Sequence, residues 1–184
     1  MQLKRILQKR NPKKLQTESG KRWREALART LVAIQFMMLS IIGIVALNKP
    51  QKGPHNYLAF EFGSLALGLI VIGAAGWSLR PSLRVSPIPK TDAPLIESGI
   101  YRFVRHPMYL GVILIGFGIA GYADSGFAWS SELILIINLN FKARFEDALL
   151  LEIHPQSLHY QLHVSRILPC LGGSCRSNSE LRRF

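Results

Sequence analysis

The densest group of polar side chains in this chain lies between Gly99 and Tyr109, and it contains Arg105, His106 and Pro107 in direct succession. Proline suits the first turn of a helix, where backbone N–H groups have no intrahelical partner. Those free amides, together with a guanidinium and an imidazole, would form a positive mouth able to hold an anion. The alternative is anchoring at a membrane boundary, where Arg and Tyr are also common.

Glu146 and Asp147 form a second cluster, two adjacent acids on a helical segment further along the chain. Paired carboxylates beside a positive mouth could hold ribose hydroxyls or a cationic ligand. They could equally form a structural ion pair with Arg105 across the fold. The residue types therefore leave both a binding role and a purely structural role open.

Two further motifs are weaker. Gly116 and Gly118 lie inside an apolar run with no strand before them, so they do not form a dinucleotide-binding fingerprint. They would serve close helix packing, or they would let a flat ligand approach the backbone. His159 and His163 are one helical turn apart, but without a third ligand they do not predict a metal site.

Apolar segments of about membrane-spanning length must position these residues, and they lie at 31–47, 57–79, 108–123 and 127–141. The fourth segment contains Glu132, so we expect it not to face lipid on all sides. From Lys142 the pattern becomes amphipathic, and the helix is predicted to leave the membrane and continue to about His154, before Pro155. The sequence thus predicts an all-α, polytopic integral membrane protein with about four transmembrane helices and a C-terminal amphipathic helix.

Composition agrees with that architecture. The 184 residues are 48% hydrophobic, and yet the formal net charge is +12. Because charged and apolar residues are segregated along the chain, we exclude a disordered chain, a disulfide-stapled secreted domain and a simple DNA-binding domain, and expect no nucleic-acid partner. Of the 23 Lys and Arg residues, all but Lys49 and Lys52 fall on one side of the predicted layout. The positive-inside rule then places both termini and the candidate site in the cytoplasm.

The same layout divides the chain into four regions. Residues 1–29 form a basic N-terminal arm held near anionic headgroups, and residues 30–79 form the first two transmembrane helices. Residues 80–171 form one unit, which consists of the connector, two transmembrane helices and the C-terminal helix. Residues 172–184 form a tail.

In their order, these motifs resemble the isoprenylcysteine carboxyl methyltransferase (ICMT) family, including its bacterial relatives, and more distantly the phospholipid N-methyltransferases. The resemblance covers roughly the C-terminal half, and it rests on the strings Tyr101-Arg102-x-x-Arg105-His106-Pro107-x-Tyr109-x-Gly111, Lys142-x-Arg144-x-Glu146-Asp147, His159-Tyr160 and Arg166-Ile167-Leu168-Pro169. The chain departs from the family where two glutamates are usual, because its second acid is Asp147.

The resemblance implies a membrane methyltransferase that uses S-adenosylmethionine without a Rossmann domain, acts on a lipophilic or lipidated acceptor, and most readily methylates a carboxyl oxygen. It assigns cofactor binding to Tyr101, Arg105, His106, Pro107, Tyr109, Gly116, Gly118, Glu146, Asp147 and Tyr160. Arg105, His106 and Glu146 would carry the chemistry. Arg102 and Arg166 would steer the acceptor, and no metal ion is implied.

Two rival functions stay open. The C-terminal pattern is also distantly similar to membrane sterol reductases, which would make the chain a nicotinamide-dependent oxidoreductase. A non-catalytic membrane subunit would instead use the Arg-His-Pro cluster as an anchor and the paired acids as a salt-bridge latch. Cofactor binding separates these three functions.

Overall fold

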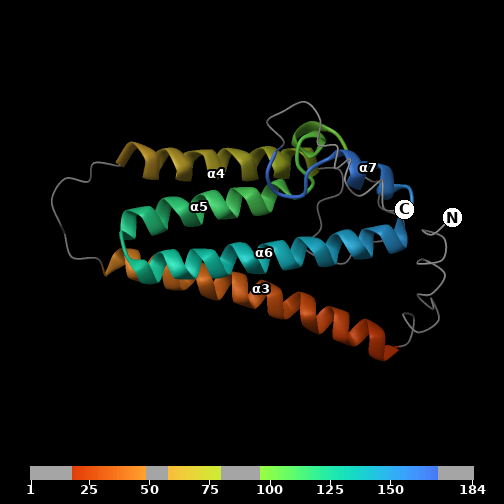
Figure 1. The fold of residues 1–184 in the computed structure, drawn as a ribbon, viewed down its shortest axis with the longest axis horizontal. Helices are drawn as coiled ribbons and strands as arrows, with labels where there is room; N and C mark the ends of the chain where they lie inside the picture. Colours follow the sequence, from red (N-terminus) through yellow and green to blue (C-terminus); the bar gives the residue numbers. More distant parts are fainter. Residues whose placement is uncertain (1–17, 49–57, 80–95, 170–184) are drawn as a thin grey trace, which may run out of the picture.

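The described part of the chain is built from helices (Figure 1). This computed structural model describes residues 18–48, 58–79 and 96–169. Within those ranges the elements are α3 (Glu18–Leu47), α4 (Leu58–Leu79), the 3-10 helix η2 (Gly99–Arg102), α5 (Pro107–Ala123), α6 (Gly126–Ile153) and α7 (Ser157–His163). The predicted all-α class is confirmed for these residues. The start of the basic arm, most of the connector and the predicted tail lie outside them.

The first helix is longer than the sequence pattern predicted. It begins at Glu18, whereas the apolar run begins at Leu31, so the second part of the basic arm is helical. This charged extension lies along the far end of α6, where Arg24 Nη1 is 2.9 Å from Glu152 Oε2. Helices α4, α5 and α6 begin and end within about one residue of their predicted bounds.

The turn between α5 and α6 is short because its residues suit it. Asp124 ends α5 in the left-handed region, at φ 43°, a conformation that Asp tolerates better than most residues. Ser125 then caps α6 by accepting a hydrogen bond from the Phe127 amide. At its other end α5 begins at Pro107, as predicted for a first-turn proline.

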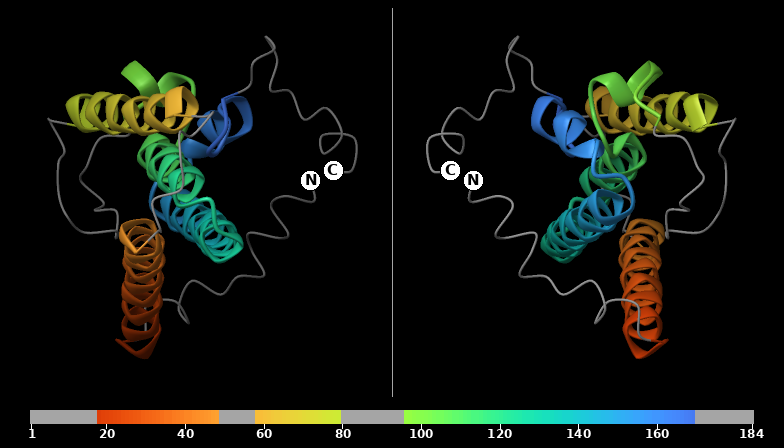
Figure 2. Two further views of the ribbon diagram at one scale, coloured as in Figure 1. Left: turned by 90° about the vertical axis from the view of Figure 1, so that its left-hand side faces the viewer. Right: turned by 90° about the vertical axis from the view of Figure 1, so that its right-hand side faces the viewer.

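Helix α5 lies at the centre of the molecule, with α4 on one side and α6 on the other (Figures 1 and 2). Helix α3 packs on α6 and α5, away from α4. Buried side chains from α3, α5 and α6 form a common core of Met38, Ile42, Ala120, Ala123, Ala128, Leu135 and Leu139.

Helices α4 and α5 approach each other closely through glycines. A Cβ atom at Gly68 would lie 2.7 Å from the carbonyl oxygen of Gly111, and one at Gly111 would lie 2.8 Å from the carbonyl oxygen of Gly68. The Ser64 hydroxyl donates to the Leu114 carbonyl oxygen at 2.7 Å in the same interface. Small residues thus allow backbone-to-backbone packing, which is typical of helices that associate in lipid.

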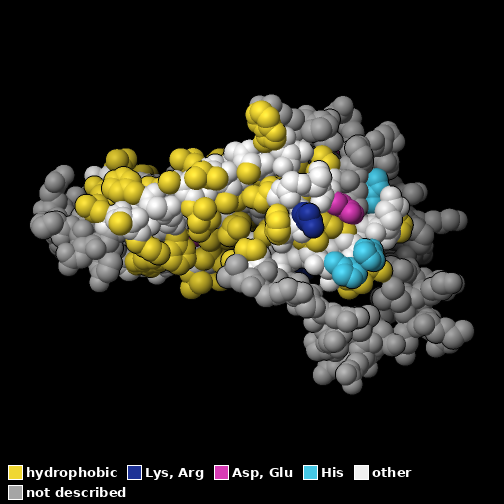
Figure 3. Space-filling view, turned by 90° about the horizontal axis from the view of Figure 1, so that it is seen from above, with side chains coloured by type: hydrophobic (Ala, Val, Ile, Leu, Met, Phe, Trp, Pro, Cys, Tyr) yellow, Lys and Arg dark blue, Asp and Glu magenta, His cyan; other side chains and the backbone are white. Residues whose placement is uncertain are grey.

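Two described helices are long and apolar enough to cross a membrane, Arg22–Leu47 within α3 and the whole of α4. Helix α5 is also apolar but has 17 residues. Large apolar side chains are exposed on α3, α4 and α6, among them Phe36, Ile44, Leu69, Ile70, Ile137 and Phe141. Figure 3 shows apolar side chains over most of one face, whereas charged and His side chains gather toward the end where α7 lies.

Glu132, in the second turn of α6, is buried, as expected for a helix that does not face lipid on all sides. Its side chain is 1% exposed and packs against Gly116 of α5. Neither carboxyl oxygen has a hydrogen-bond partner among the described residues.

Candidate functional site

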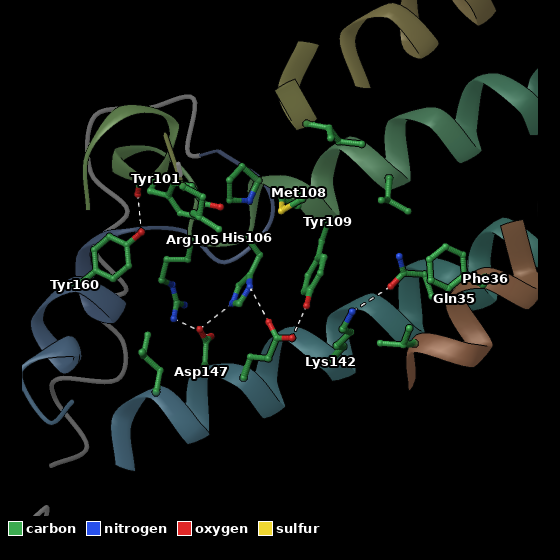
Figure 4. A pocket seen from close by; sticks show the side chains of 17 residues that line it. Gln35, Phe36, Tyr101, Arg105, His106, Met108, Tyr109, Lys142, Asp147 and Tyr160 are labelled. Carbon is green, nitrogen blue, oxygen red and sulfur yellow. Dashed lines mark hydrogen bonds and ion pairs between the residues drawn. The ribbon is translucent and has the colours of Figure 1, made fainter. Parts of the chain in front are cut away.

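A pocket of about 610 Å³ lies where α3, α4, α5 and α6 meet the η2 and α7 end of the molecule (Figure 4). This volume is in the range usual for small-molecule sites. Most of the residues that the sequence singled out line it: Tyr101, Arg105, His106, Pro107, Tyr109, Glu146, Asp147 and Tyr160. Segments far apart in sequence therefore converge on one cavity.

The segment that follows α7 holds the Arg-His-Pro motif in place. The Arg105 amide donates to the Ser165 carbonyl oxygen at 2.8 Å, and the His106 amide donates to the Arg166 carbonyl oxygen at 2.9 Å. The Arg105 Nε atom also donates to the Val164 carbonyl oxygen at 2.9 Å. These bonds fix the backbone before α5, so both side chains enter the pocket from a rigid support.

Tyr160 fastens α7 to η2. Its hydroxyl donates to the Tyr101 carbonyl oxygen at 2.6 Å. Burial raises the pKa of Tyr160, and burial together with the charge of Glu146 raises the pKa of Tyr101 to about 12. Both phenols therefore stay protonated at physiological pH, and the Tyr160 hydroxyl is a neutral hydrogen-bond donor.

Asp147 is the centre of the charge network. Its Oδ2 lies 2.8 Å from Arg105 Nη1 and accepts from Arg166 Nε at 2.8 Å, while its Oδ1 lies 3.0 Å from His106 Nε2. Burial alone would raise the pKa of Asp147, but these hydrogen bonds and positive charges outweigh it and lower the pKa. Asp147 is thus an ionised group whose oxygens are already occupied by protein donors.

Glu146 faces the other side of the same imidazole. Its Oε1 accepts from the Tyr109 hydroxyl at 2.6 Å, and its Oε2 lies 3.6 Å from His106 Nδ1. The His106 and Tyr109 rings stack, with centroids 5.2 Å apart and planes 5° apart. Burial raises the pKa of Glu146, against the opposing effects of Tyr109, His106 and Lys142. The imidazole is therefore held between two carboxylates.

Several pocket residues were not predicted from the sequence. Helix α3 contributes Val32, Gln35 and Phe36, and α6 contributes Lys142, whose Nζ donates to Gln35 Oε1 at 3.2 Å (Figure 4). Lys142 Nζ also lies 4.8 Å from the centroid of the Tyr109 ring. The position of Lys142 at the end of an apolar run could have marked it in the sequence as a site residue. The α3 residues had none, because nothing local indicates which helix packs beside the motif.

Four predicted residues do not reach the pocket. Gly116 and Gly118 lie about three turns into α5, where the Glu132 side chain and the backbone of α4 occupy the space beside them, so in this structure they serve helix packing, the alternative that the sequence left open. Arg102 is exposed and does not line the pocket. Arg166 lies behind the lining, bound to Asp147.

No group of three or more His, Cys, Asp or Glu side chains suited to a metal ion occurs within residues 18–48, 58–79 and 96–169. The two histidines noted in the sequence stack on each other, with ring centroids 4.1 Å apart.

Comparison with known proteins gives one finding. The sequence model of the PEMT family, described as phospholipid methyltransferase, matches residues 57–157. Neither the curated proteins nor the solved structures that were compared match the chain. The matched range covers α4, η2, α5 and α6, and with them the Arg-His-Pro motif and the paired acids, whereas α3 and all of α7 after its first residue lie outside it. Because the match extends over more than half of its length, the chain belongs to the phospholipid methyltransferase family.

Proposed function

We propose that this chain is an integral membrane methyltransferase that transfers the methyl group of S-adenosylmethionine to a lipophilic acceptor, with a carboxylate oxygen as the leading acceptor atom. The observation that carries the proposal is that one pocket has both a charged end and an apolar end. Arg105, His106 and Glu146 line the charged end, and residues of α3, α4 and α5 line the apolar end. Such a pocket suits the meeting of a polar methyl donor and a lipid-like acceptor.

The side chains at the charged end fit the cofactor. Arg105 Nη1 is buried and lies close to Asp147 without hydrogen-bonding geometry, so it has donor capacity left for the carboxylate of S-adenosylmethionine. His106, the next residue in the chain, contacts the same cofactor carboxylate in this proposal. Glu146 Oε2, 3.6 Å from His106 Nδ1, can accept from ribose hydroxyls or from the cofactor ammonium. The rings of Tyr109 and Tyr160 line the pocket between these polar groups.

Asp147 and Arg166 have a different role in this proposal. Asp147 holds Arg105 and His106 in position, and Arg166 keeps Asp147 in place from outside the pocket. We therefore propose both as positioning residues rather than as direct ligands of cofactor or acceptor. Arg102, being exposed, has no place in the site.

S-adenosylmethionine supplies a methyl group on a sulfonium, and transfer to a carboxylate breaks the sulfur–carbon bond, forms an oxygen–carbon bond and moves no proton. The protein's task is then to orient the two partners and to exclude water. An amine or thiol acceptor would have to lose a proton, and Glu146 and His106 are the groups placed to accept it.

The membrane arrangement follows from the apolar and charged surfaces. We propose that α3, α4, α5 and residues 127–141 of α6 cross the bilayer as four spans, and that the rest of α6 and α7 form the amphipathic cytoplasmic part together with both termini. The exposed apolar side chains on α3, α4 and α6 and the segregation of Lys and Arg support this arrangement. Because α3 lines the pocket, the functional unit includes α3 as well as region 80–171.

The test is cofactor binding and product identification. Purified protein should bind S-adenosylmethionine and not NADPH, and incubation with labelled methyl donor and total membrane lipids should yield a labelled lipid. His106→Ala and Glu146→Gln should each weaken S-adenosylmethionine binding at least about tenfold, because each removes a polar contact to a charged ligand. Arg144→Gln is the matched control, since Arg144 is an exposed residue of α6 that does not line the pocket.

The two rival functions are outcomes of the same test. Binding of NADPH in place of S-adenosylmethionine would indicate an oxidoreductase, and binding of neither would indicate a non-catalytic subunit. Unchanged S-adenosylmethionine affinity in both site variants would refute the residue assignment alone.

A further inference from the structure

The Lys142 ammonium differs in its partners from Arg105 and His106, the other basic side chains that line the pocket. Its residue is 8% exposed, and among the described residues its hydrogen bond goes to the neutral Gln35 side chain. Arg105 and His106, by contrast, each lie within 3.0 Å of a carboxylate oxygen of Asp147. No described carboxylate forms an ion pair with Lys142.

A buried ammonium of this kind is costly for the protein. Removing a charge from water is unfavourable unless an opposite charge or several hydrogen bonds compensate it. Here the compensation is one amide oxygen at 3.2 Å and the face of the Tyr109 ring at 4.8 Å from its centroid. Glu146, one turn along α6, attracts the ammonium from a distance without an ion pair. The charge of Lys142 is therefore not compensated by an anion in direct contact with it among the described residues.

The place where that anion would lie adjoins an apolar surface. Val32 and Phe36 of α3 flank Gln35 in the pocket wall, and Val112 of α5 follows Tyr109 by one turn. Ile72 of α4 completes the wall from a helix that does not pack on α3. An anionic group at Lys142 would thus adjoin apolar lining residues of α3 and α4, two helices that expose large apolar side chains, and a hydrocarbon chain attached to it could lie between them.

We propose that Lys142, held in position by Gln35, binds an anionic headgroup of the acceptor, so that the protein selects amphiphiles that carry a carboxylate or a phosphate next to an apolar chain. This inference rests on the proposed function, because it assigns the acceptor side of the same pocket. It makes Lys142 a specificity-determining residue and Gln35 a positioning residue.

The proposal also assigns a role to α3. This helix lies outside the range matched by the family, yet it supplies Gln35 and the apolar residues beside it. Acceptor selection would then depend on a helix outside the matched range, whereas the Arg-His-Pro motif and the paired acids lie within it.

The experiment measures binding of defined probes to the full-length protein in a neutral detergent. The probes are myristate, dodecyl phosphate, the neutral monomyristoylglycerol and inorganic phosphate. The wild type should bind the two anionic amphiphiles at least about tenfold more tightly than the neutral one, because a hydrogen-bonded charge pair in a buried site contributes that much. Inorganic phosphate, which has no chain, should bind at least about tenfold more weakly than dodecyl phosphate.

Variants assign the preference to Lys142. Lys142→Gln should abolish the preference for anionic amphiphiles, Lys142→Arg should retain most of it, and Gln35→Leu should weaken it while the charge remains. Arg144→Gln removes an equal charge from the exposed side of the same helix and should leave the preference unchanged. The affinity of Lys142→Gln for S-adenosylmethionine should stay within about twofold of the wild-type value.

A stability measurement separates loss of a contact from loss of the fold. Lys142→Met removes an uncompensated buried charge, so without ligand its thermal midpoint should equal or exceed that of the wild type. Adding myristate should raise the midpoint of the wild type and not that of Lys142→Met.

Three results would overturn the proposal: equal wild-type affinity for anionic and neutral amphiphiles, equal affinity for inorganic and dodecyl phosphate, or a parallel loss of S-adenosylmethionine binding in Lys142→Gln. The last would assign Lys142 to the cofactor. Failure of the wild type to bind S-adenosylmethionine would instead refute the proposed function, and the amphiphile preference would still decide what Lys142 binds.

Discussion

Replacing Gly68 by alanine should separate α4 from α5. The added Cβ would lie 2.7 Å from the Gly111 carbonyl oxygen and 3.1 Å from the Ile115 amide nitrogen, and ordinary contact begins at 3.4 Å. Both atoms belong to the backbone of α5 and cannot rotate away. The helices must therefore move apart by about 0.7 Å at this level, the difference between 3.4 and 2.7 Å.

Gly73→Ala is the matched control on the same helix, because a Cβ at Gly73 has nothing within 4 Å. Both substitutions gain the same helix propensity, about 1 kcal/mol, so the difference between them isolates the clash. Overpacking of this kind costs about 1–3 kcal/mol. Gly68→Ala should thus be less stable than Gly73→Ala by about 1–3 kcal/mol.

The assay is thermal unfolding of both variants in the same detergent. For a chain of this size the difference corresponds to a midpoint about 2–12 °C lower for Gly68→Ala. Acceptor-probe affinity should fall as well, because Ile72 lies one turn from Gly68 and lines the pocket. A midpoint for Gly68→Ala equal to or above that of Gly73→Ala would refute the close approach of α4 and α5.

Three further predictions concern single contacts. Tyr160→Phe removes the hydroxyl that donates to the Tyr101 carbonyl oxygen, and should lower the free energy of unfolding in denaturant titrations by about 1 kcal/mol; no change would mean that this bond does not hold α7. The pKa of Asp147 is lowered from its ordinary value of 3.8, so the stability advantage of the wild type over Asp147→Asn should shrink as the pH falls below 3.8; an advantage that grows as the pH falls through this window would contradict the network. Gly116→Ala should destabilise the wild type and not a Glu132→Ala background, with a coupling of about 0.5–3 kcal/mol in thermal unfolding, and additive effects would show that the two residues do not touch.

The helices themselves were largely predictable. Apolar runs between prolines and glycines predicted α4, α5 and α6 within about one residue of their bounds, and Pro107 predicted the first turn of α5. These features are local, because a helix satisfies its backbone hydrogen bonds within its own segment. The extension of α3 to Glu18 was missed, since its charged first turns lie beside α6, a distant part of the chain.

The polar residues at the site were mostly identified by type and order in the sequence, whereas their partners were not. The pairing of His106 with Asp147 joins residues 41 apart, and that of Gln35 with Lys142 joins residues 107 apart. The sequence left the paired acids open to a binding or a structural role. In the structure the two acids divide these roles, because Asp147 is occupied by protein donors while Glu146 faces the pocket with an accessible oxygen.

By itself, then, the sequence determined which segments are helical, where the charged residues lie along the chain and which motif marks the site. Only the tertiary structure decided which helix faces meet. Helices α4 and α5 are apolar on nearly all sides, so no amphipathic pattern indicates the face that packs inward. Steric fit decides it instead: glycines allow α4 and α5 to touch, Glu132 occupies the space beside Gly116, and the remaining space beside α3 becomes the pocket.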